Sequence, residues 1–303
     1  MDGGKDSQIR LEAEKLLRLR HVAQSQHARR ARRAQPIGAL PGTLTTRRRG
    51  RGIEVHDIRL WLDGDDMRHI DANTTARTGQ PHVRTFRDDH ESTALLVADF
   101  RPSMLFGTKR TFKSIAAAEA LALVGWSMLA GERRIGLFAF GPGTPTFVPP
   151  QSGERAMAAI IAGLVDCHER ALDSDEVEDL PLSESLEMAT QHLPPGGALV
   201  LATALDEPGP NFEALISSCA HRASVHVFVI SDAFEREAPR GWYPFTIGRG
   251  QPEWGRFHAK KNNAIDERLA LLAGLGVSAV LLEVERDPEI MIPELESLDV
   301  PGA

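Results

Sequence analysis

The sequence predicts an α/β protein with an open, mostly parallel sheet covered by helices on both faces. Short, continuous apolar runs such as Ala94–Ala98, Ala198–Ala202 and Val225–Ile230 are typical of strands buried on both faces. Helical patterns of about 10–20 residues separate these runs, as in βαβ units. The composition, 42% hydrophobic and 25% charged, excludes wholesale disorder, a collagen-like repeat and a disulfide scaffold.

The N-terminal region predicts a helix followed by a loop. Residues 8–34 are rich in helix-forming residues, and Pro36 ends the run. The apolar stripe of this helix is imperfect, so we expect it to dock only in part; the stripe comprises Ile9, Leu16, Leu17 and Leu19. Residues 35–52 are rich in glycine, proline and arginine and predict a linker or irregular loop.

The rest of the chain divides into a small extension and an alternating α/β body. Ile53–Leu62 and Pro81–Arg87 are strand-like, with the polar segment Asp63–Arg77 between them. The strands expected after them are Ala94–Ala98, Arg134–Phe140, Ala198–Ala202, Val225–Ile230 and Ser278–Val284. One helix is expected to begin near Thr111, and the others are Glu154–His168, Leu182–His192, Phe212–His221, Ala264–Ala273 and Pro288–Leu295. The predicted division is therefore 1–52, 53–90 and 91–303.

The charge is unevenly distributed along the chain. Residues 1–52 hold 13 Lys and Arg against 4 Asp and Glu, whereas residues 53–303 hold 22 against 38. A basic segment of this kind favours a contact with nucleic acid, with an anionic membrane surface or with an acidic protein face. The arginines concerned are Arg29, Arg30, Arg32, Arg33 and Arg47–Arg49, and no aromatic residue lies among them to stack on bases.

Three further features bear on location. Cys167 and Cys219 lack the spacing of a zinc motif, and so few thiols favour a reducing cytoplasm. Residues 1–25 contain no apolar run that would suit a signal peptide. Ile115–Ala130 is shorter than a membrane span requires and predicts a buried helix. We therefore expect a cytoplasmic protein.

Enzyme motifs are missing from the sequence. It contains no phosphate-binding GxxxxGK[ST], no dinucleotide-binding GxGxxG, no GxSxG elbow and no HExxH. Asp166–Glu169 contains reactive residue types, but adjacent residues on a helix point in different directions. We interpret it as a polar helix end and expect a protein that is not an enzyme.

Ligands of open α/β sheets bind at the carboxyl ends of the strands, which directs attention to the residues just after each strand. These positions hold Asp99–Ser103, Thr203–Asp206 and Ser231–Asp232.

Several segments resemble the DUF58 family. Arg59–Asp71 contains the family's Gly-Asp-Asp motif, followed by Arg and then by Ile-Asp. Ala76–Phe86 contains its Ala-Arg and Val-Arg-x-Phe motifs. Val97–Gly107 contains its Asp-x-Ser-x-Ser-Met and Phe-Gly motifs with one substitution. Asp232–Pro239 is similar to the family's Asp-Pro-x-Glu and Pro motif. The family's Trp after Ile-Asp is Ala72 here, which removes any contact that an indole would make.

The resemblance implies a von Willebrand factor A-like (vWA-like) fold. It also implies an adaptor or co-chaperone that works with a MoxR-type AAA+ ATPase in the maturation of a metalloenzyme or complex. The ADFRPSM segment resembles the MxaS-like branch that accompanies methanol oxidation. Many family members carry N-terminal membrane helices, and this sequence departs from them in that respect.

The same resemblance raises the question of a metal site. A vWA domain often binds Mg²⁺ through Asp-x-Ser-x-Ser with a distant Thr and a distant Asp, since hard cations require oxygen ligands. Asp99 and Ser103 match, but Arg101 replaces the middle Ser and is able to pair with Asp99 instead. The substitutes for the distant ligands are Ser183 and the displaced Asp206. No cofactor is therefore expected, and a Mg²⁺-dependent ligand-binding protein is the alternative.

Two groups of residues complete the expected sites. The Gly-Asp-Asp segment alternates acids with arginines, which favours a structural ion-pair network over general acid–base chemistry; its residues are Arg59, Gly64, Asp65, Asp66, Arg68, Asp71 and Arg77. The partner-binding surface is expected at the carboxyl edge of the sheet, on Asp99, Arg101, Ser103, Thr203 and Asp206. The resemblance makes a protein contact the favoured role of the basic N-terminus and leaves nucleic acid as a distant alternative.

Overall fold

The computed structural model describes residues 9–33, 55–61, 67, 70–86, 93–131, 133–237, 240–245, 253–257 and 264–290. The chain forms two compact units, one of Met1–Ala34 with Ser92–Ala303 and one of Gln35–Glu91. The N-terminal helix therefore belongs to the unit that contains the main sheet, whereas the sequence-based division set residues 1–52 apart.

The main unit is built on a six-stranded sheet. Its order is β10 (Ser278–Glu283), β7 (Ser224–Ser231), β6 (Ala198–Thr203), β3 (Thr93–Asp99), β4 (Arg134–Phe140) and β5 (Thr146–Gln151). Neighbouring strands are parallel except β5, which runs antiparallel to β4 at one edge. The predicted α/β class, with an open and mostly parallel sheet, is confirmed. Strand β5 was not predicted, because it contains two prolines. Proline argues against a strand unless the strand lies at the edge of a sheet.

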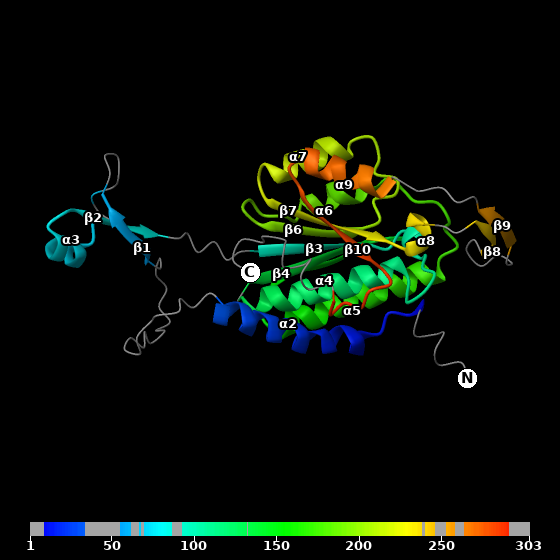
Figure 1. Cartoon of the computed structure of the whole chain (residues 1–303), viewed down its shortest axis with the longest axis horizontal. Helices are drawn as coiled ribbons and strands as arrows, with labels where there is room; N and C mark the ends of the chain where they lie inside the picture. The colour runs from blue at the N-terminus through cyan, green and yellow to red at the C-terminus, as the bar shows by residue number, and fades with distance from the viewer. Residues whose placement is uncertain are drawn as a thin grey trace. The chain divides into compact units, whose positions relative to one another are not determined.

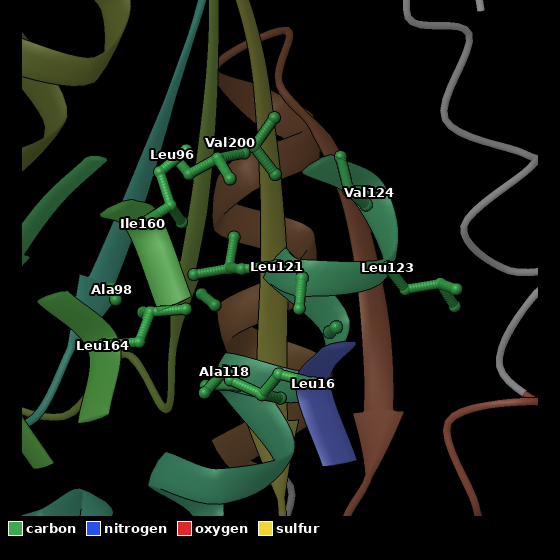
Figure 2. Close-up of a cluster of buried hydrophobic side chains, with 14 of the residues drawn as sticks. Leu16, Leu96, Ala98, Ala118, Leu121, Leu123, Val124, Ile160, Leu164 and Val200 are labelled. Carbon is green, nitrogen blue, oxygen red and sulfur yellow. The ribbon is translucent and has the colours of Figure 1, made fainter. Parts of the chain in front are cut away.

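Helices cover both faces of this sheet (Figure 1). On one face lie α4 (Lys113–Ala130), α5 (Glu154–Asp173) and α2 (Ala13–Arg33), and on the other α6 (Leu182–Thr190), α7 (Phe212–Ala220) and α9 (Ala264–Gly274). Each face buries its own apolar cluster. Figure 2 shows part of the first cluster, where Leu16, Leu121, Ile160 and Leu96 come from three helices and a strand.

Helix α4 lies at the centre of this first layer. It is the one described helix long and apolar enough to cross a membrane by length and composition, and 83% of that window is buried inside the protein. It packs on β3, β4, β6 and β7 beneath α2. The prediction of a buried helix at Ile115–Ala130 is confirmed by this packing.

Helix α2 docks on α4 along its length. Among its described side chains, which end at Ser25, the buried ones are Leu16, Leu19 and Ala23, with Leu11 just before the helix. Trp126 of α4 donates its indole N–H to the carbonyl of Leu16 at 3.0 Å. Ile9 and Leu17, which were expected in the buried stripe, are 39% and 45% exposed. Leu11 is buried instead of Ile9. The helix begins at Ala13, so the residues before it do not follow the helical periodicity.

The smaller unit contains an antiparallel pair, β1 (Val55–Leu60) and β2 (His82–Phe86), as expected for the β-containing extension. A helix that was not predicted, α3 (Ala72–Thr78), lies between them in sequence. Asp71 caps it by accepting a hydrogen bond from the Thr74 amide at 2.7 Å. Gly79 ends it in the left-handed region at φ 73°.

The C-terminal part of the main unit holds elements that the sequence reasoning missed. A short helix, α8 (Ala233–Arg236), follows β7 directly. An antiparallel pair, β8 (Gly241–Phe245) and β9 (Glu253–Phe257), comes next. Residues 288–290 form a turn rather than the start of the helix expected at Pro288–Leu295, and the other residues of that helix lie outside the described ones.

Candidate functional site

The site begins where β3 ends, at Asp99. The strand is buried on both faces, so its last residue places a carboxylate inside the protein, with none of its surface exposed. A buried carboxylate must be paired and hydrogen-bonded. Thr203, the last residue of the neighbouring strand β6, donates its hydroxyl to Asp99 Oδ2 at 2.7 Å. Parallel pairing of β3 and β6 therefore brings together two residues that are far apart in the sequence.

Arg101 supplies the charge that Asp99 requires. Its Nε donates to Asp99 Oδ1 at 3.1 Å and its Nη2 to Oδ2 at 2.8 Å, which is a bidentate pair. Its backbone N–H also donates to Oδ1 at 3.0 Å. Burial alone lowers the pKa of Arg101, but the carboxylates of Asp99, Asp179 and Asp206 together outweigh burial, and the pKa is raised above its ordinary value. The guanidinium therefore stays charged at every physiological pH.

The outer side of the same guanidinium binds backbone carbonyls from two other loops. Nη1 donates to Leu180 O at 2.6 Å and Nη2 to Asp206 O at 2.8 Å, with Glu207 O at 3.3 Å from Nη1. We call Asp99, Arg101, Thr203 and these three carbonyls the Arg101 cluster. One cation thus ties together the loops that follow β3, α5 and β6.

The loop after β6 has a backbone that needs such support. Leu205 and Glu207 have φ angles of 59° and 41°, in the left-handed region that non-glycine residues rarely adopt. The Leu205 amide donates to Thr203 Oγ1 at 3.0 Å, and Arg268 Nη1 donates to Ala204 O at 2.7 Å. Bonds from the Arg101 cluster and from α9 therefore hold the strained turn.

The residues at this edge do not fit a divalent cation. The Arg101 guanidinium lies against the Asp99 carboxylate, where a metal would have to bind. Among the described residues, no group of three or more His, Cys, Asp or Glu has the arrangement of a metal site. Asp206 turns its carboxylate to Arg268 and Lys113 instead.

The two serines expected as ligands have other neighbours. The Ser103 amide donates to Asp179 Oδ1 at 2.9 Å, and its hydroxyl is buried without a hydrogen-bond partner. Asp179 also lies 3.8 Å from Arg101 Nη1, so it adds a second carboxylate beside the guanidinium that the sequence reasoning did not single out. Ser183 is 6% exposed, and a Cβ on Gly209 would lie 2.4 Å from its hydroxyl oxygen.

A second buried cation lies next to the Arg101 cluster. Lys113, at the start of α4, is 1% exposed and donates to Glu235 Oε1 at 2.6 Å. Its Nζ is also 3.5 Å from Asp206 Oδ2. Because Glu235 belongs to α8 and Asp206 to the loop after β6, Lys113 connects the two. The sequence offered no signal for this contact, since three distant segments contribute to it.

Helix α8 is fixed by its own capping residues. Asp232, with no exposed surface, accepts hydrogen bonds from the amide of Phe234 at 2.8 Å and from the hydroxyl of Thr108 at 2.7 Å. The Asp232 amide donates to Glu235 Oε2 at 3.1 Å, which completes a capping box. The motif beginning at Asp232 thus has a structural role at the strand end.

The burial of the cluster corrects one expectation. Asp99 and Thr203 have no exposed surface and Arg101 only 3%, so these three do not form a contact surface themselves. The exposed side chains on the loops they hold include Val177 at 52% and Leu180 at 63%. Glu178 is exposed between them in sequence, and Glu207 is exposed on the loop after β6, where its carbonyl and that of Leu180 accept from the same Arg101 nitrogen. We call these four residues the rim. The signal that could have found it is one apolar residue inside the acidic run 173–179, Val177, and another directly after it, Leu180.

The Asp166–Glu169 group exposes its two carboxylates but buries Cys167 and His168. Cys167 is 1% exposed, and burial raises the pKa of its thiol to about 12. His168 has no exposed surface, and its Nε2 lies 2.9 Å from the carbonyl of Ile9. Burial lowers the pKa of His168. Both side chains thus lie in the core between α5 and the N-terminal segment, where a polar helix end was expected.

Several predicted residues lie outside what the structure describes. In the Gly-Asp-Asp segment these are Gly64, Asp65, Asp66 and Arg68, together with the side chain of Arg59. Asp71 is the helix cap described above, and Arg77 is exposed in the last turn of α3. The side chains of Arg29, Arg30, Arg32 and Arg33, and all of Arg47–Arg49, also lie outside the described residues. The expected ion-pair network and basic contact therefore stay predictions.

The fold and the site define an α/β protein in which an arginine of the chain itself fills the cation position at the strand ends. The chain belongs to the DUF58 family: the family model described as "Protein of unknown function DUF58" matches residues 57–246. The sequence-based resemblance to this family is confirmed.

Curated relatives match over a limited stretch. The proteins named Rv1480 of Mycobacterium tuberculosis and Mb1516 of Mycobacterium bovis, both described as uncharacterized, are each 36% identical over 119 residues. This region is 39% of the present chain and 35% of each relative. The chain thus spans about a third of the length of these relatives.

Solved structures with a similar fold are distant in sequence. BatB from Bacteroides thetaiotaomicron is 12% identical with a TM-score of 0.44, covering 68% of this chain and 97% of that one. An aerotolerance-related membrane protein from Bacteroides fragilis is 14% identical with a TM-score of 0.41, covering 68% and 98%. A von Willebrand factor type A structure from Catenulispora acidiphila is 15% identical with a TM-score of 0.39, covering 71% and 42%.

Proposed function

We propose that this protein is a non-enzymatic adaptor that binds a MoxR-type AAA+ ATPase and assists the maturation of an enzyme or complex. The observation that carries the proposal is the Arg101 cluster. Its polar groups form hydrogen bonds with one another and hold the loops in place, rather than binding a ligand. Rigid loops that expose apolar side chains are suited to binding another protein.

The rim is the surface that we assign to this contact. Val177 and Leu180 provide apolar area that is costly to leave in water, and Glu178 and Glu207 add negative charge around it. Arg101 holds the backbone of Leu180 directly, so the rim keeps its shape before the partner arrives. Such preorganisation lowers the entropy lost on binding.

Affinity measurements with the purified ATPase from the same organism test this proposal. We expect wild type to bind and Val177→Lys/Leu180→Lys to bind at least about tenfold more weakly, as for a central apolar contact. The matched control is Met188→Lys, which should bind normally. Met188 is also an exposed apolar residue, but it lies near the C-terminal end of α6. No binding by wild type, or equal binding by the rim variant, would refute the proposal.

The finer assignments belong to the same proposal. An MxaS-like role in methanol oxidation is supported only by the ADFRPSM segment, and adjacent methanol dehydrogenase genes would support it further. A cytoplasmic location is likewise proposed, and cell fractionation with an antibody against the chain would test it.

A further inference from the structure

The β8–β9 pair exposes two tryptophans on one face. Trp242 and Trp254 are 63% and 65% exposed, the largest exposed fractions of any described tryptophan. Trp242 pairs with Arg256, and Pro244 pairs with Trp254. Because alternate residues of a strand share a face, Trp242, Trp254 and Arg256 lie together on one side, with the two indoles at diagonal positions. We call these three residues the aromatic face.

The opposite side of the pair is anchored to the main unit. Tyr243 points to that side and packs edge-on against Phe234 of α8, with ring centroids 4.9 Å apart. The ring centroid of Phe234 in turn lies 6.3 Å from that of Phe106. The capping box and the ion pair of Lys113 with Glu235 hold α8 itself. The aromatic face is therefore directed away from a supported side, and its exposure does not result from a detached hairpin.

The sequence segment that contains the aromatic face has a charge opposite to that of the body. Residues 240–261 hold five Lys and Arg against one Asp or Glu, whereas residues 53–303 as a whole carry a net negative charge. Within the described part, Arg240 and Arg256 are both exposed. Tryptophan and arginine are the residues most enriched at the energetic centres of protein interfaces.

We propose that the aromatic face is a docking surface for an acidic, apolar segment of a partner protein. The indoles would cover apolar side chains of that segment, and Arg256 would pair with its carboxylates. A protein segment fits better than nucleic acid or an anionic membrane, because the described part of this region exposes only two arginines, Arg240 and Arg256. Binding to a polyanion or to an anionic membrane depends on many such cations. The residues of this surface differ from those of the rim, and the proposal does not require the partner to be an ATPase.

A peptide-binding measurement on the full-length chain tests this inference. The probe is a labelled synthetic peptide that alternates Glu and Leu, and its control has Lys in place of every Glu. We expect wild type to bind the acidic peptide in preference to the basic one. Trp242→Ala/Trp254→Ala should weaken binding by at least about tenfold, and Arg256→Glu by several-fold. Phe147→Ala, a change at an exposed aromatic residue elsewhere, should leave binding unchanged.

Other occupants are distinguished in the same assay. Absence of binding to the acidic peptide, or binding unaffected by the tryptophan variants, would overturn the proposal. So would tighter binding to single-stranded oligothymidine or to vesicles of phosphatidylglycerol. A concentration-dependent dimer that the double tryptophan variant abolishes would assign the face to a second copy of this chain. Far-ultraviolet circular dichroism of each variant establishes that it is folded.

Discussion

The guanidinium of Arg101 faces the carboxylate of Asp99 with 2.8 Å between Nη2 and Oδ2, and neither side chain is more than 4% exposed. An ion pair in such a position is costly to assemble but much costlier to break by removing one partner. Thr203 and the backbone carbonyls satisfy the remaining donors and acceptors of the pair. The loops at the carboxyl edge therefore depend on a charge that the chain itself provides.

Replacing Arg101 by Leu should destabilise the protein by about 3–5 kcal/mol, because the Asp99 carboxylate would stay buried without a counter-charge. Urea denaturation measures the change. Arg18→Leu removes an exposed ion pair with Glu14 and should cost no more than about 0.5 kcal/mol. A loss below about 1 kcal/mol for Arg101→Leu would show that Asp99 is not held as a buried ion.

Divalent cations should leave the wild-type melting temperature unchanged within about 1 °C, since binding stabilises only a protein that has a site for the ligand. Thermal denaturation with Mg²⁺ and with EDTA checks this. The Arg101→Ser variant should have a lower melting temperature than wild type, and Mg²⁺ should raise it. Serine restores an oxygen ligand beside Asp99, Ser103 and Thr203. Equal shifts in wild type and variant would contradict the view that Arg101 occupies the cation position.

Leu16→Ala should cost about 2–4 kcal/mol, because Leu16 has no exposed surface and fills the space between α2 and α4. Its neighbour Leu17 is 45% exposed, so Leu17→Ala should change the free energy of unfolding by less than about 0.5 kcal/mol. Chemical denaturation of both variants gives the comparison. Similar losses at the two positions would mean that α2 does not dock as described.

Stability should fall as the pH drops below 6.5, the ordinary pKa of histidine, because burial lowers the pKa of His168 in the folded chain. Between the folded pKa and 6.5 the unfolded chain binds the extra proton and the folded chain does not. The unfolded state is therefore favoured in that window. His168→Gln should show a smaller decrease between about pH 7.5 and 5.5. Parallel pH profiles for wild type and variant would refute this assignment.

Much of the main unit followed from local pattern. The five parallel strands and most helices were predicted because continuous apolar runs and helical periodicity are properties of short segments. Strand β5, the pair β8–β9 and α8 were missed, since prolines, glycines and short lengths hide an edge strand or a single helical turn. The stripe of α2 was only partly right, because docking on α4 decided which residues became buried.

The sequence by itself determined the α/β class, the residues at the strand ends and the replacement of an expected serine by Arg101. Only the tertiary structure decided what Arg101 does, because its partners come from β3 and from two loops that begin after residues 173 and 203. It also decided that the cluster is buried and that Leu180 and Trp242 are exposed. Burial and long-range pairing depend on how distant segments pack, and no local pattern encodes that.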